Sequence, residues 1–349
     1  MNSFKTGKGV RSLSRLAAAV ALALAATAGL SRADEVVLSN GDKLTGKIGT
    51  VSGDSMKFTS PALGDMTIKL ANIKSYSTDT PATLRLENRQ FVTGTIKQAD
   101  ATQITTTDGK SYQAADVKRV NPPAVGWTGS VVASGALDRG NSNSESVGFS
   151  AGAVLRRDTP ETDDRFTLST AYNFVRTGRG AAGDTTTDNL AGSVKYDDFI
   201  TDKLYGYGNA GYYHDRIAEL NYRLTPGAGI GYQWFEQKSL NFYTEAGVSY
   251  LYEDYENAPI DQNTAFRLAY HVNTAINDQV SLFHDVEYVA PFKLSQTNHY
   301  IIAADAGIRA DLTKSIFTEF KVVYQRNDSP PAGRLKDDLM YLLGVGWKF

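Results

Sequence analysis

The chain has 349 residues and a formal net charge of −2 at neutral pH, which gives no electrostatic reason to expect nucleic acid as a partner. It holds 19 Tyr, 15 Phe and 31 Gly but no Cys, so disulfide staples and cysteine-ligated metals are excluded. This composition is unusual for a soluble enzyme and favours a fold of aromatic strands and tight turns.

The first 33 residues carry the features of a secretory signal. Residues 1–15 include four basic side chains and no acid, and the apolar run LAAAVALALAATAGL follows them. That run is shorter than the ~20 apolar residues a spanning helix needs, and SRADE supplies a small-residue cleavage site after Ala33. We therefore expect export and removal of residues 1–33. A retained anchor is the alternative, whereas a lipid anchor is excluded because no Cys is present.

Residues 34–123 contain an internal repeat. The segment VVLSNGDKLTGKI is followed by ATLRLENRQFVTGTI, with Thr45-Gly46 matching Thr93-Gly94. Short alternating runs broken by Gly, Asn and Asp predict small strands joined by tight turns. The two copies, about 36–76 and 82–121, resemble SH3-like or Sm-like modules. Each copy is too small to be stable alone, so we expect the two to pack together.

Residues 124–349 break into about twelve runs of roughly 9 to 14 residues that alternate between apolar and polar side chains. In FRLAYHVNTAI, for example, Leu268 and Tyr270 share one side with other apolar residues, and Arg267 and His271 share the opposite side. A membrane-spanning strand needs about 9–11 residues with an apolar lipid face and a polar lumen face. We therefore predict an all-β chain: an antiparallel transmembrane β-barrel of about twelve strands after a small β-domain of two repeated modules.

The links between the runs alternate in length. Links such as TGRGAAGDTTT, DRIAELN and NDSPPAGRLKDD are long and polar, whereas TDK, EQKS, NDQ and TKS are tight. One link on the tight side, DTPETDD, is longer than expected. Long loops at one end and short turns at the other are typical of outer-membrane barrels, and an even strand number puts both barrel termini on the periplasmic side. We expect an outer-membrane barrel with residues 34–123 in the periplasm.

The chain ends on the alternating run YLLGVGWKF. The side chains expected to face lipid in this last strand are Tyr341, Leu343, Val345, Trp347 and Phe349. A barrel satisfies its backbone only if its last strand pairs with its first, and a terminal aromatic ring anchors that strand at the membrane interface. The run also resembles the C-terminal signal that the barrel assembly machinery reads. The alternative is an edge strand of a soluble, secreted β-sandwich.

Three segments, GALDRGNSNSESVGFSAG, YDDFITDKLYGYGNAGYYHDR and YRLTPGAGIGYQW, together with the Phe349 terminus, are similar to the family of salt-induced outer-membrane proteins. The resemblance covers about two thirds of the chain. It implies an outer-membrane β-barrel that responds to salt or stress, and it supplies no catalytic residues. The repeat in residues 34–123 departs from the simplest members, so the resemblance implies no role for it.

Catalytic and metal chemistry find little support in the sequence. The chain has four histidines, which are His214, His271, His284 and His299. His214 precedes Asp215, but no serine stands at a spacing that would complete a hydrolase site, and a loop hydrogen bond is the simpler interpretation. No pair of histidines has the spacing of metal ligands. We expect no enzyme activity, no cofactor and no metal, and an outer-membrane hydrolase is the alternative.

The alternation places charges of both signs inside the barrel. The predicted lumen-lining residues are Arg156, Lys195, Asp197, Arg223, Glu245, Arg267, Asp285, Glu287, Asp305, Arg309, Asp311, Glu319 and Lys321. Such charges either line a narrow passage for ions or small solutes, or they pair across a tight lumen and close it. We favour a closed or very narrow lumen, with the pore as the alternative.

The lysines of the first repeat leave two interpretations open for residues 34–123. They could bind peptidoglycan or a periplasmic protein, or the domain could be a spacer or plug whose lysines are only solvated. We expect a non-enzymatic envelope protein with a structural, anchoring or stress-related role. Its expected partners are outer-membrane lipid, the barrel assembly machinery during biogenesis, and this periplasmic ligand.

Overall fold

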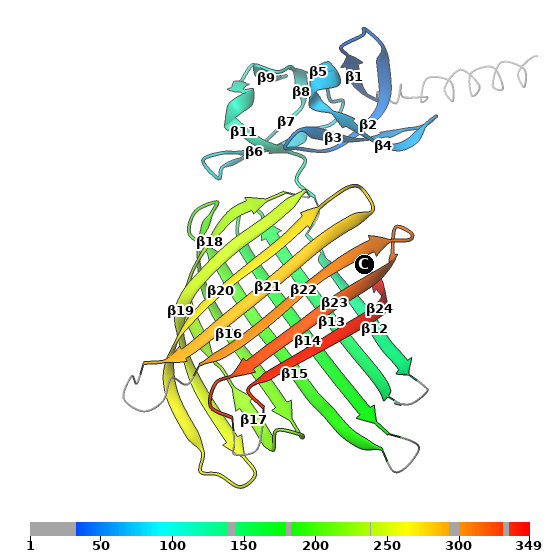
Figure 1. Cartoon of the computed structure of the whole chain (residues 1–349). Helices are drawn as coiled ribbons and strands as arrows, with labels where there is room; N and C mark the ends of the chain where they lie inside the picture. The colour runs from blue at the N-terminus through cyan, green and yellow to red at the C-terminus, as the bar shows by residue number, and fades with distance from the viewer. Residues whose placement is uncertain are drawn as a thin grey trace, which may run out of the picture. The chain divides into compact units, whose positions relative to one another are not determined.

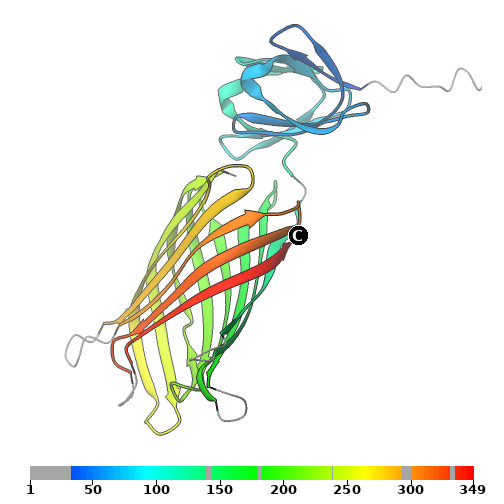
Figure 2. The same ribbon diagram turned by 45° about the vertical axis from the view of Figure 1, so that its right-hand side comes forward.

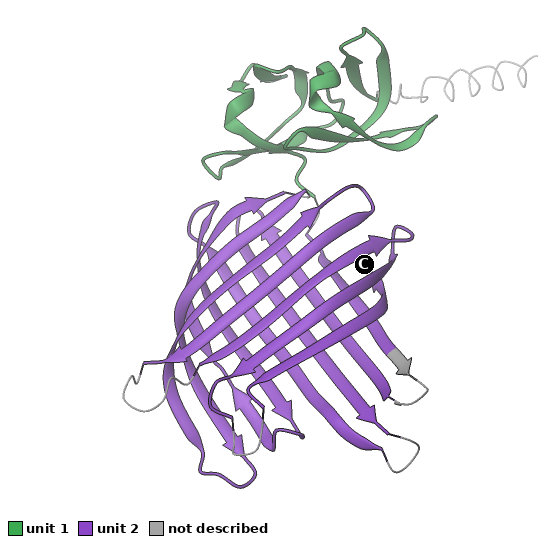
Figure 3. Ribbon diagram, viewed as in Figure 1, with its two compact units in different colours: residues 1–123 green, residues 124–349 purple. Residues whose placement is uncertain are grey.

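The computed structural model describes residues 33–123, 125–138, 144–178, 183–237, 239–292, 300–330 and 335–349, without the side chains of residues 136–138. The chain divides into two compact units, residues 1–123 and 124–349 (Figure 3). Residues 1–32, which carry the predicted signal, lie outside the described residues, and Ala33 is exposed and precedes the first strand. Within the described ranges, no helix has the length and apolar character needed to cross a membrane.

The first unit consists of the two sequence repeats, and the copies share one order of elements except that the long β2 of the first corresponds to two shorter strands, β7 and β8, in the second. The first copy contains β1 (Asp34–Leu38), β2 (Lys43–Ser52), β3 (Ser55–Ser60), β4 (Gly64–Lys69), the 3₁₀ turn η1 (Leu70–Asn72) and β5 (Ile73–Ser77). The second contains β6 (Ala82–Leu86), β7 (Phe91–Gly94), β8 (Ile96–Ala99), β9 (Gln103–Thr106), β10 (Ser111–Gln113), η2 (Ala114–Asp116) and β11 (Val117–Val120). The first turns also correspond, because Gly41 and Arg89 both have positive φ, at 92° and 68°.

The two copies exchange strand contacts instead of closing separately. The last strand of the first copy, β5, pairs with β8 of the second, and the last strand of the second, β11, pairs with β2 of the first. One sheet therefore runs β10-β9-β8-β5-β1-β2-β11-β6-β7, with β3 paired to β2 and β4 paired to β3. Most of these strands are labelled in Figure 1. Residues from both copies, including Val36, Phe58 and Leu84, bury one shared hydrophobic core. Each copy therefore depends on the other for its core.

The repeated Thr-Gly dipeptide has a packing role in β2. A Cβ on Gly46 would lie 2.2 Å from the Thr59 carbonyl oxygen and 2.8 Å from the Phe58 ring. Glycine is therefore required where β2 crosses close over β3. At the matching position Gly94, the nearest atom belongs to Thr106 at 3.2 Å, so this copy is less tightly packed.

Tyr76 gives the first unit a predicted pH dependence. Burial raises the pKa of its phenol from 10.0 to about 12, and the side chain is 8% exposed. Above pH 10 the Tyr76 phenol ionises in the unfolded chain but stays neutral in the folded unit. The free energy of unfolding is therefore at its full value below pH 10 and falls as the pH rises towards 12. Between pH 9 and 11.5, wild type should lose roughly 2 kcal/mol more than Tyr76→Phe in urea unfolding of this unit. Equal losses in the two proteins would contradict the assignment.

The second unit is a closed antiparallel barrel (Figures 1 and 2). Its strands are β12 (Trp127–Asp138), β13 (Ser144–Asp158), β14 (Asp163–Thr177), β15 (Asp184–Phe199), β16 (Leu204–Asp215), β17 (Leu220–Leu224), β18 (Gly227–Glu236), β19 (Leu240–Tyr255), β20 (Asp261–Ala275), β21 (Val280–Pro291), β22 (Ile301–Asp311), β23 (Ile316–Asn327) and β24 (Asp337–Lys348). Both β17 and β18 pair with β16 and β19, so they form one interrupted strand. The barrel therefore has twelve strand positions, as predicted.

The interruption lies at Thr225-Pro226. Thr225 still exchanges backbone hydrogen bonds with Gly211, and the Pro226 carbonyl accepts one from Tyr250. Proline has no N–H to donate to the ladder, so regular pairing stops there and resumes at Gly227. The predicted strand is present, but it consists of two segments.

Two of the predicted link lengths differ from the structure. The segment DTPETDD gives a turn of only Thr159–Thr162, because its aspartates extend β13 and β14, and Thr159 N–H donates to the Thr162 carbonyl at 2.9 Å. The segment DRIAELN, expected to be long, is a four-residue turn before β17, in which Glu219 has a φ of 57°. Side-chain hydrogen bonding shortens this turn, because Asp215 accepts the N–H groups of Ile217 and Ala218.

The alternation of side chains follows the pleat of the barrel. On the exterior, large apolar side chains such as Val147, Ile230 and Leu343 are 57%, 60% and 65% exposed. The intervening positions bury charged side chains, including Asp197 and Glu245 at 0% and 4% exposed. The barrel is therefore apolar outside and polar inside.

The last strand closes the barrel against the first. β24, red in Figure 2, pairs with β23 on one side and with β12 on the other. The terminal residue Phe349 exchanges two backbone hydrogen bonds of 3.1 Å with Gly129. Its ring stacks on Trp347 with centroids 5.2 Å apart. The five residues predicted to face lipid, Tyr341, Leu343, Val345, Trp347 and Phe349, are all between 48% and 65% exposed.

Candidate functional site: the barrel lumen

Polar and charged side chains converge inside the barrel. Of the thirteen residues that the sequence placed there, twelve take part in ion pairs and Asp285 bonds to His271; the twelve are Arg156, Lys195, Asp197, Arg223, Glu245, Arg267, Glu287, Asp305, Arg309, Asp311, Glu319 and Lys321. Some pairs join neighbouring strands, and others span several strands of the wall. The pairs that span the lumen decide how much of it is filled.

The short-turn cluster, made of Arg156, Arg165, Asp197, Gln233 and Glu236, lies near the end with the short turns. Arg156 on β13 donates from Nε to Glu236 on β18 at 2.9 Å. Arg165 on β14 donates to Asp197 Oδ2 at 2.6 Å and to Gln233 Oε1 on β18 at 2.9 Å. Arg165 and Asp197 are direct neighbours on β14 and β15. Arg156 and Glu236 are four strand steps apart, and Arg165 and Gln233 are three, so the side chains of these two pairs cross the lumen. Arg165 is 6% exposed and Asp197 is fully buried.

The central cluster consists of Lys195, Tyr207, Glu245, Arg267 and Glu287. Glu245 on β19 receives hydrogen bonds from Lys195 on β15 and, at 2.9 Å, from Arg267 on β20. Arg267 also donates to Tyr207 on β16 at 3.0 Å and pairs with Glu287 at 2.7 Å. Glu245 therefore lies between two cations that neutralise it, which is the condition for burying a carboxylate.

The long-loop cluster lies towards the opposite end. Tyr213 on β16 donates to Gln325 on β23 at 2.8 Å, and these strands are six steps apart in the barrel order. Asn327 on β23 donates to the Tyr255 hydroxyl on β19 at 3.2 Å. Arg223 pairs with Glu253, which also accepts from Tyr255. Opposite walls of the barrel are therefore joined directly.

Glycines make room for the inward tyrosines. A Cβ on Gly231 would lie 2.2 Å from the Tyr205 ring, and one on Gly247 would lie 2.5 Å from the Tyr207 hydroxyl. The rings therefore lie against a wall that lacks side chains. Tyr205 and Tyr207 are 0% and 5% exposed.

Adding a methyl group at this wall should destabilise the barrel. We expect Gly231→Ala to lower the free energy of unfolding by about 1–3 kcal/mol, because the Tyr205 ring must move and loosen its 3.0 Å bond to Glu245. Gly208→Ala is the matched control, since a Cβ there meets nothing within 4 Å. Urea unfolding of both variants in lipid checks the prediction, and equal effects would contradict it.

One side of the lumen is less completely filled. A cavity of about 200 Å³ is bordered by β12 and β13 and by β20 to β23. Its ionisable lining residues are His271, Asp285, Asp305, Arg309, Glu319 and Lys321. Asp285 and Asp305 are direct partners on neighbouring strands, and both side chains are partly exposed, at 47% and 39%. The longest ion pair among these residues joins Lys321 to Asp305 at 3.7 Å.

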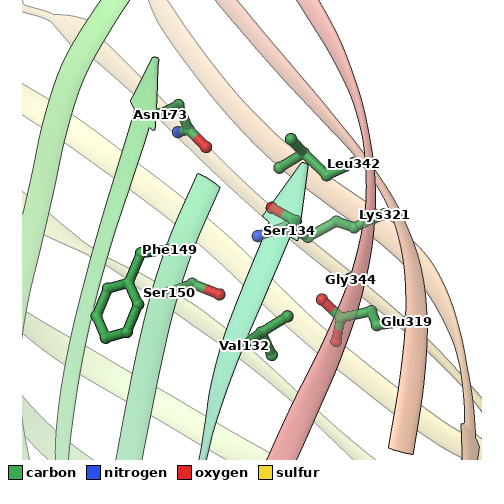
Figure 4. Close-up of a pocket in the computed structure, with 9 residues that line it drawn as sticks. All are labelled: Val132, Ser134, Phe149, Ser150, Asn173, Glu319, Lys321, Leu342 and Gly344. Carbon is green, nitrogen blue, oxygen red and sulfur yellow. The ribbon is translucent and has the colours of Figure 1, made fainter. Parts of the chain in front are cut away.

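A smaller pocket lies beside this cavity at the β12–β24 closure (Figure 4). Ser134 and Val132 of β12 and Leu342 and Gly344 of β24 line it. It shares Val132 and three other lining residues, Ser150, Glu319 and Lys321, with the larger cavity. The two spaces are therefore adjacent.

The histidines do not form a catalytic arrangement in the described residues. His214 Nδ1 contacts the Asn221 carbonyl at 2.8 Å, while Asp215 Oδ2 lies 3.0 Å from the Tyr213 hydroxyl. His271 bonds to Asp285, and His284 bonds to Tyr270; His299 lies outside the described residues. In the part of the chain that the structure describes, no three His, Asp or Glu side chains gather to hold a metal ion.

Several lumen residues were missed by the sequence interpretation. Arg165 could have been found from the alternation, because an even number of residues separates it from the polar Asn173 on the same strand. Both side chains are buried in the structure. The run LYGYGNAGYY could not be phased, since tyrosine and glycine fit either face. The structure turns Tyr205, Tyr207 and Tyr213 inward, and Gly206 and Gly208 alternate with them.

Comparisons with known proteins cover mainly the barrel. The family model described as "Protein of unknown function, DUF481" matches residues 131–349. That description does not mention salt, and the match excludes residues 33–123, so salt induction and the SH3-like modules stay predictions. No curated protein matches the chain.

Solved structures resemble the chain at low sequence identity. The NanC porin has 12% identity and a TM-score of 0.40, covering 65% of this chain and 100% of the porin. The translocator domain of the autotransporter NalP from Neisseria meningitidis has 12% identity and a TM-score of 0.35, covering 66% and 90%. The beta domain of the Bordetella autotransporter BrkA has 14% identity and a TM-score of 0.31, covering 65% and 99%.

Proposed function

The chain belongs to the DUF481 family, and on that premise we propose that it is a non-enzymatic outer-membrane barrel of the cell envelope, with a lumen closed by its own side chains. Its role is structural or anchoring, and its barrel is not a general diffusion pore. Residues 34–123 then lie in the periplasm, where they bind peptidoglycan or a periplasmic protein. A narrow pore is the second candidate, because the lumen keeps a cavity of about 200 Å³.

The cross-lumen hydrogen bonds carry this proposal. They join β13 to β18, β15 to β19, β16 to β20 and β16 to β23. A water-filled pore would keep its charged side chains against the wall, whereas here they bond to partners on distant strands. Buried charges that are paired and hydrogen-bonded can be held away from water.

The two faces of the barrel support the placement in a membrane. Its exterior carries large exposed apolar side chains in every part of the described wall, among them Leu168, Val248 and Ile308. A soluble barrel would leave this surface in water at a large free-energy cost. The twelve closed strand positions satisfy the backbone in hydrocarbon, where unpaired groups cost several kcal/mol each.

Liposome swelling with small sugars tests the closed lumen. We expect wild type to remain silent. Replacing the inward tyrosines Tyr205, Tyr207 and Tyr213 by Ala should give measurable swelling, because their bonds to Glu245, Arg267 and Gln325 are lost. Heat-modifiable gel mobility shows that each variant is folded.

Three outward tyrosines provide the matched control for this experiment. Tyr172, Tyr212 and Tyr250 are 37%, 40% and 42% exposed, so their replacement by Ala removes equal bulk and leaves the lumen unchanged. We expect this variant to remain silent. If wild type caused swelling as fast as the variant without the three inward tyrosines, the closed lumen would be refuted and the pore would be the better proposal.

A further inference from the structure

The cavity of about 200 Å³ lies in the half of the lumen that ends in the short turns. Of its lining residues, Ser130 is close to the start of β12, Phe283 is close to the start of β21, and Asn273 is close to the end of β20. Towards the long loops, Gln325 and Asn327 of β23 bond across the lumen to tyrosines of β16 and β19. The cavity is therefore bounded by cross-lumen bonds on the side of the long loops.

Two aspartates face this cavity from neighbouring strands. Asp285 on β21 and Asp305 on β22 are direct register partners, and like charges placed directly opposite one another destabilise a sheet. Lys321 Nζ lies 3.7 Å from Asp305, which is longer than a hydrogen bond. Asp285 bonds to His271, which carries a charge only when it is protonated. A further cation between the two aspartates would therefore relieve their repulsion.

The other charges of the lining are matched to each other. Arg309 donates to Glu319 from both Nε and Nη2, so this pair is a bidentate one. The two aspartates then face Lys321 as the remaining cation of the lining, which leaves an excess of one carboxylate when His271 is neutral. The charge of the cavity is therefore balanced by a ligand with a single positive charge.

Hydroxyl groups line the cavity on the side away from the aspartates. Ser130 on β12 and Ser150 on β13 are three and four strand steps from β22. A serine hydroxyl both donates and accepts hydrogen bonds, so it matches a hydroxyl of a ligand, whereas an ammonium brings three donors for the carboxylates. The cavity is smaller than the ~300–1,000 Å³ of pockets that hold drug-sized ligands. Its lining therefore fits a short molecule with an ammonium at one end and hydroxyls at the other.

We infer that the lumen cavity is a binding site for a small amino alcohol, with its ammonium between Asp285 and Asp305 and its hydroxyls towards Ser130 and Ser150. The inference goes beyond the proposed function, because a structural or anchoring role needs no bound solute. It rests on the cavity and its lining, and it does not depend on whether the long-loop end of the lumen is closed.

Thermal unfolding of the full-length protein in lipid nanodiscs, followed by heat-modifiable gel mobility, tests this site. The probe is serinol, a three-carbon amine with two hydroxyl groups, and glycerol is its matched control because a hydroxyl replaces the ammonium. A ligand that binds only the folded state stabilises that state as its concentration rises. At constant ionic strength we expect serinol to raise the unfolding midpoint in a saturable way, and glycerol at the same concentrations to leave it unchanged.

Substitutions of single carboxylates locate the bound ammonium. Asp305→Asn should raise the dissociation constant of serinol about tenfold, a loss of about 1.4 kcal/mol. Asp198→Asn is the matched control, because Asp198 is exposed and follows the buried Asp197, so it lies on the barrel exterior. This control should leave the dissociation constant unchanged. If Asp305→Asn does not fold, Asp285→Asn removes the other carboxylate and should have the same effect.

An equal midpoint shift with glycerol, no saturable shift with serinol, or an unchanged dissociation constant in the folded aspartate variant would overturn the site. Stabilisation by calcium chloride with none by serinol would also overturn it, and would make the two aspartates a metal site. Either failure would leave the closed lumen intact, because liposome swelling measures the closed lumen separately. Conversely, swelling by wild type would refute the closed lumen without changing the serinol measurement.

Discussion

Replacing Arg165 by Ala should lower the free energy of unfolding of the barrel by about 3–5 kcal/mol. The guanidinium bonds to Asp197 at 2.6 Å and to Gln233 at 2.9 Å, and it lies 4.5 Å from the centroid of the Tyr243 ring. Without it, Asp197 remains fully buried with only the more distant Lys195, whose Nζ is 3.3 Å from its Oδ1. The loss should therefore exceed that of an ordinary surface ion pair, which is about 0–1 kcal/mol.

A double variant separates the lost pair from the lost packing. Arg165→Met with Asp197→Asn removes both charges and keeps most of the volume, so it should be at least 2 kcal/mol more stable than Arg165→Ala, on the order of the cost of an unpaired buried charge. Arg216→Ala is the exposed control, since the side chains of its pair with Asp188 are 62% and 20% exposed. Urea unfolding in lipid bilayers measures all three. An effect of Arg165→Ala no larger than that of Arg216→Ala would contradict the account.

Deleting Phe349 should reduce the amount of folded barrel about tenfold, equivalent to about 1.4 kcal/mol or more. The residue supplies two backbone hydrogen bonds to Gly129 and extends the short pairing between β24 and β12. Its ring also contacts the space above Gly129, where a Cβ would come within 2.7 Å of the ring. Losing Phe349 therefore removes hydrogen bonds at the end of the β12–β24 pair where the pairing is regular.

Substitutions of Phe349 separate the contribution of its backbone hydrogen bonds from that of its ring. Phe349→Ala keeps both backbone bonds and loses the ring, so it should reduce assembly less than deletion does. Phe349→Trp keeps an interfacial aromatic and should assemble almost normally. The folded fraction is read from heat-modifiable mobility, both in refolding and in cells, where we propose that the assembly machinery acts on this end. Normal assembly of the deletion variant would remove the proposed role of the C-terminus.

The architecture of the barrel was predictable because period-two alternation follows directly from the pleat of a strand. Each run with an apolar and a charged side can be phased, so the sequence alone predicts that Arg267, Asp305 and Glu319 lie inside. The repeat in the first unit was equally visible, since Thr45-Gly46 and Thr93-Gly94 mark equivalent points. In each case a local pattern determined the local structure.

The remaining features depend on how strands far apart in sequence meet. Which residue lies across the lumen from Arg156 or Tyr213 is decided by the tilt and stagger of the closed barrel, which no single run contains. The exchange of β5 and β11 between the repeats depends likewise on long-range pairing. The break at Pro226 did have a local signal, since proline cannot donate to a central ladder.

Conductance of the refolded full-length protein in a planar bilayer, with a second protein lacking residues 34–123, tests the closed lumen most directly. The account predicts no channel steps in either form while gel mobility shows a folded barrel, because the cross-lumen bonds lie within residues 124–349. Steps in both forms would contradict it and establish a pore. Steps only after deletion would also contradict it, and would make the first unit a plug.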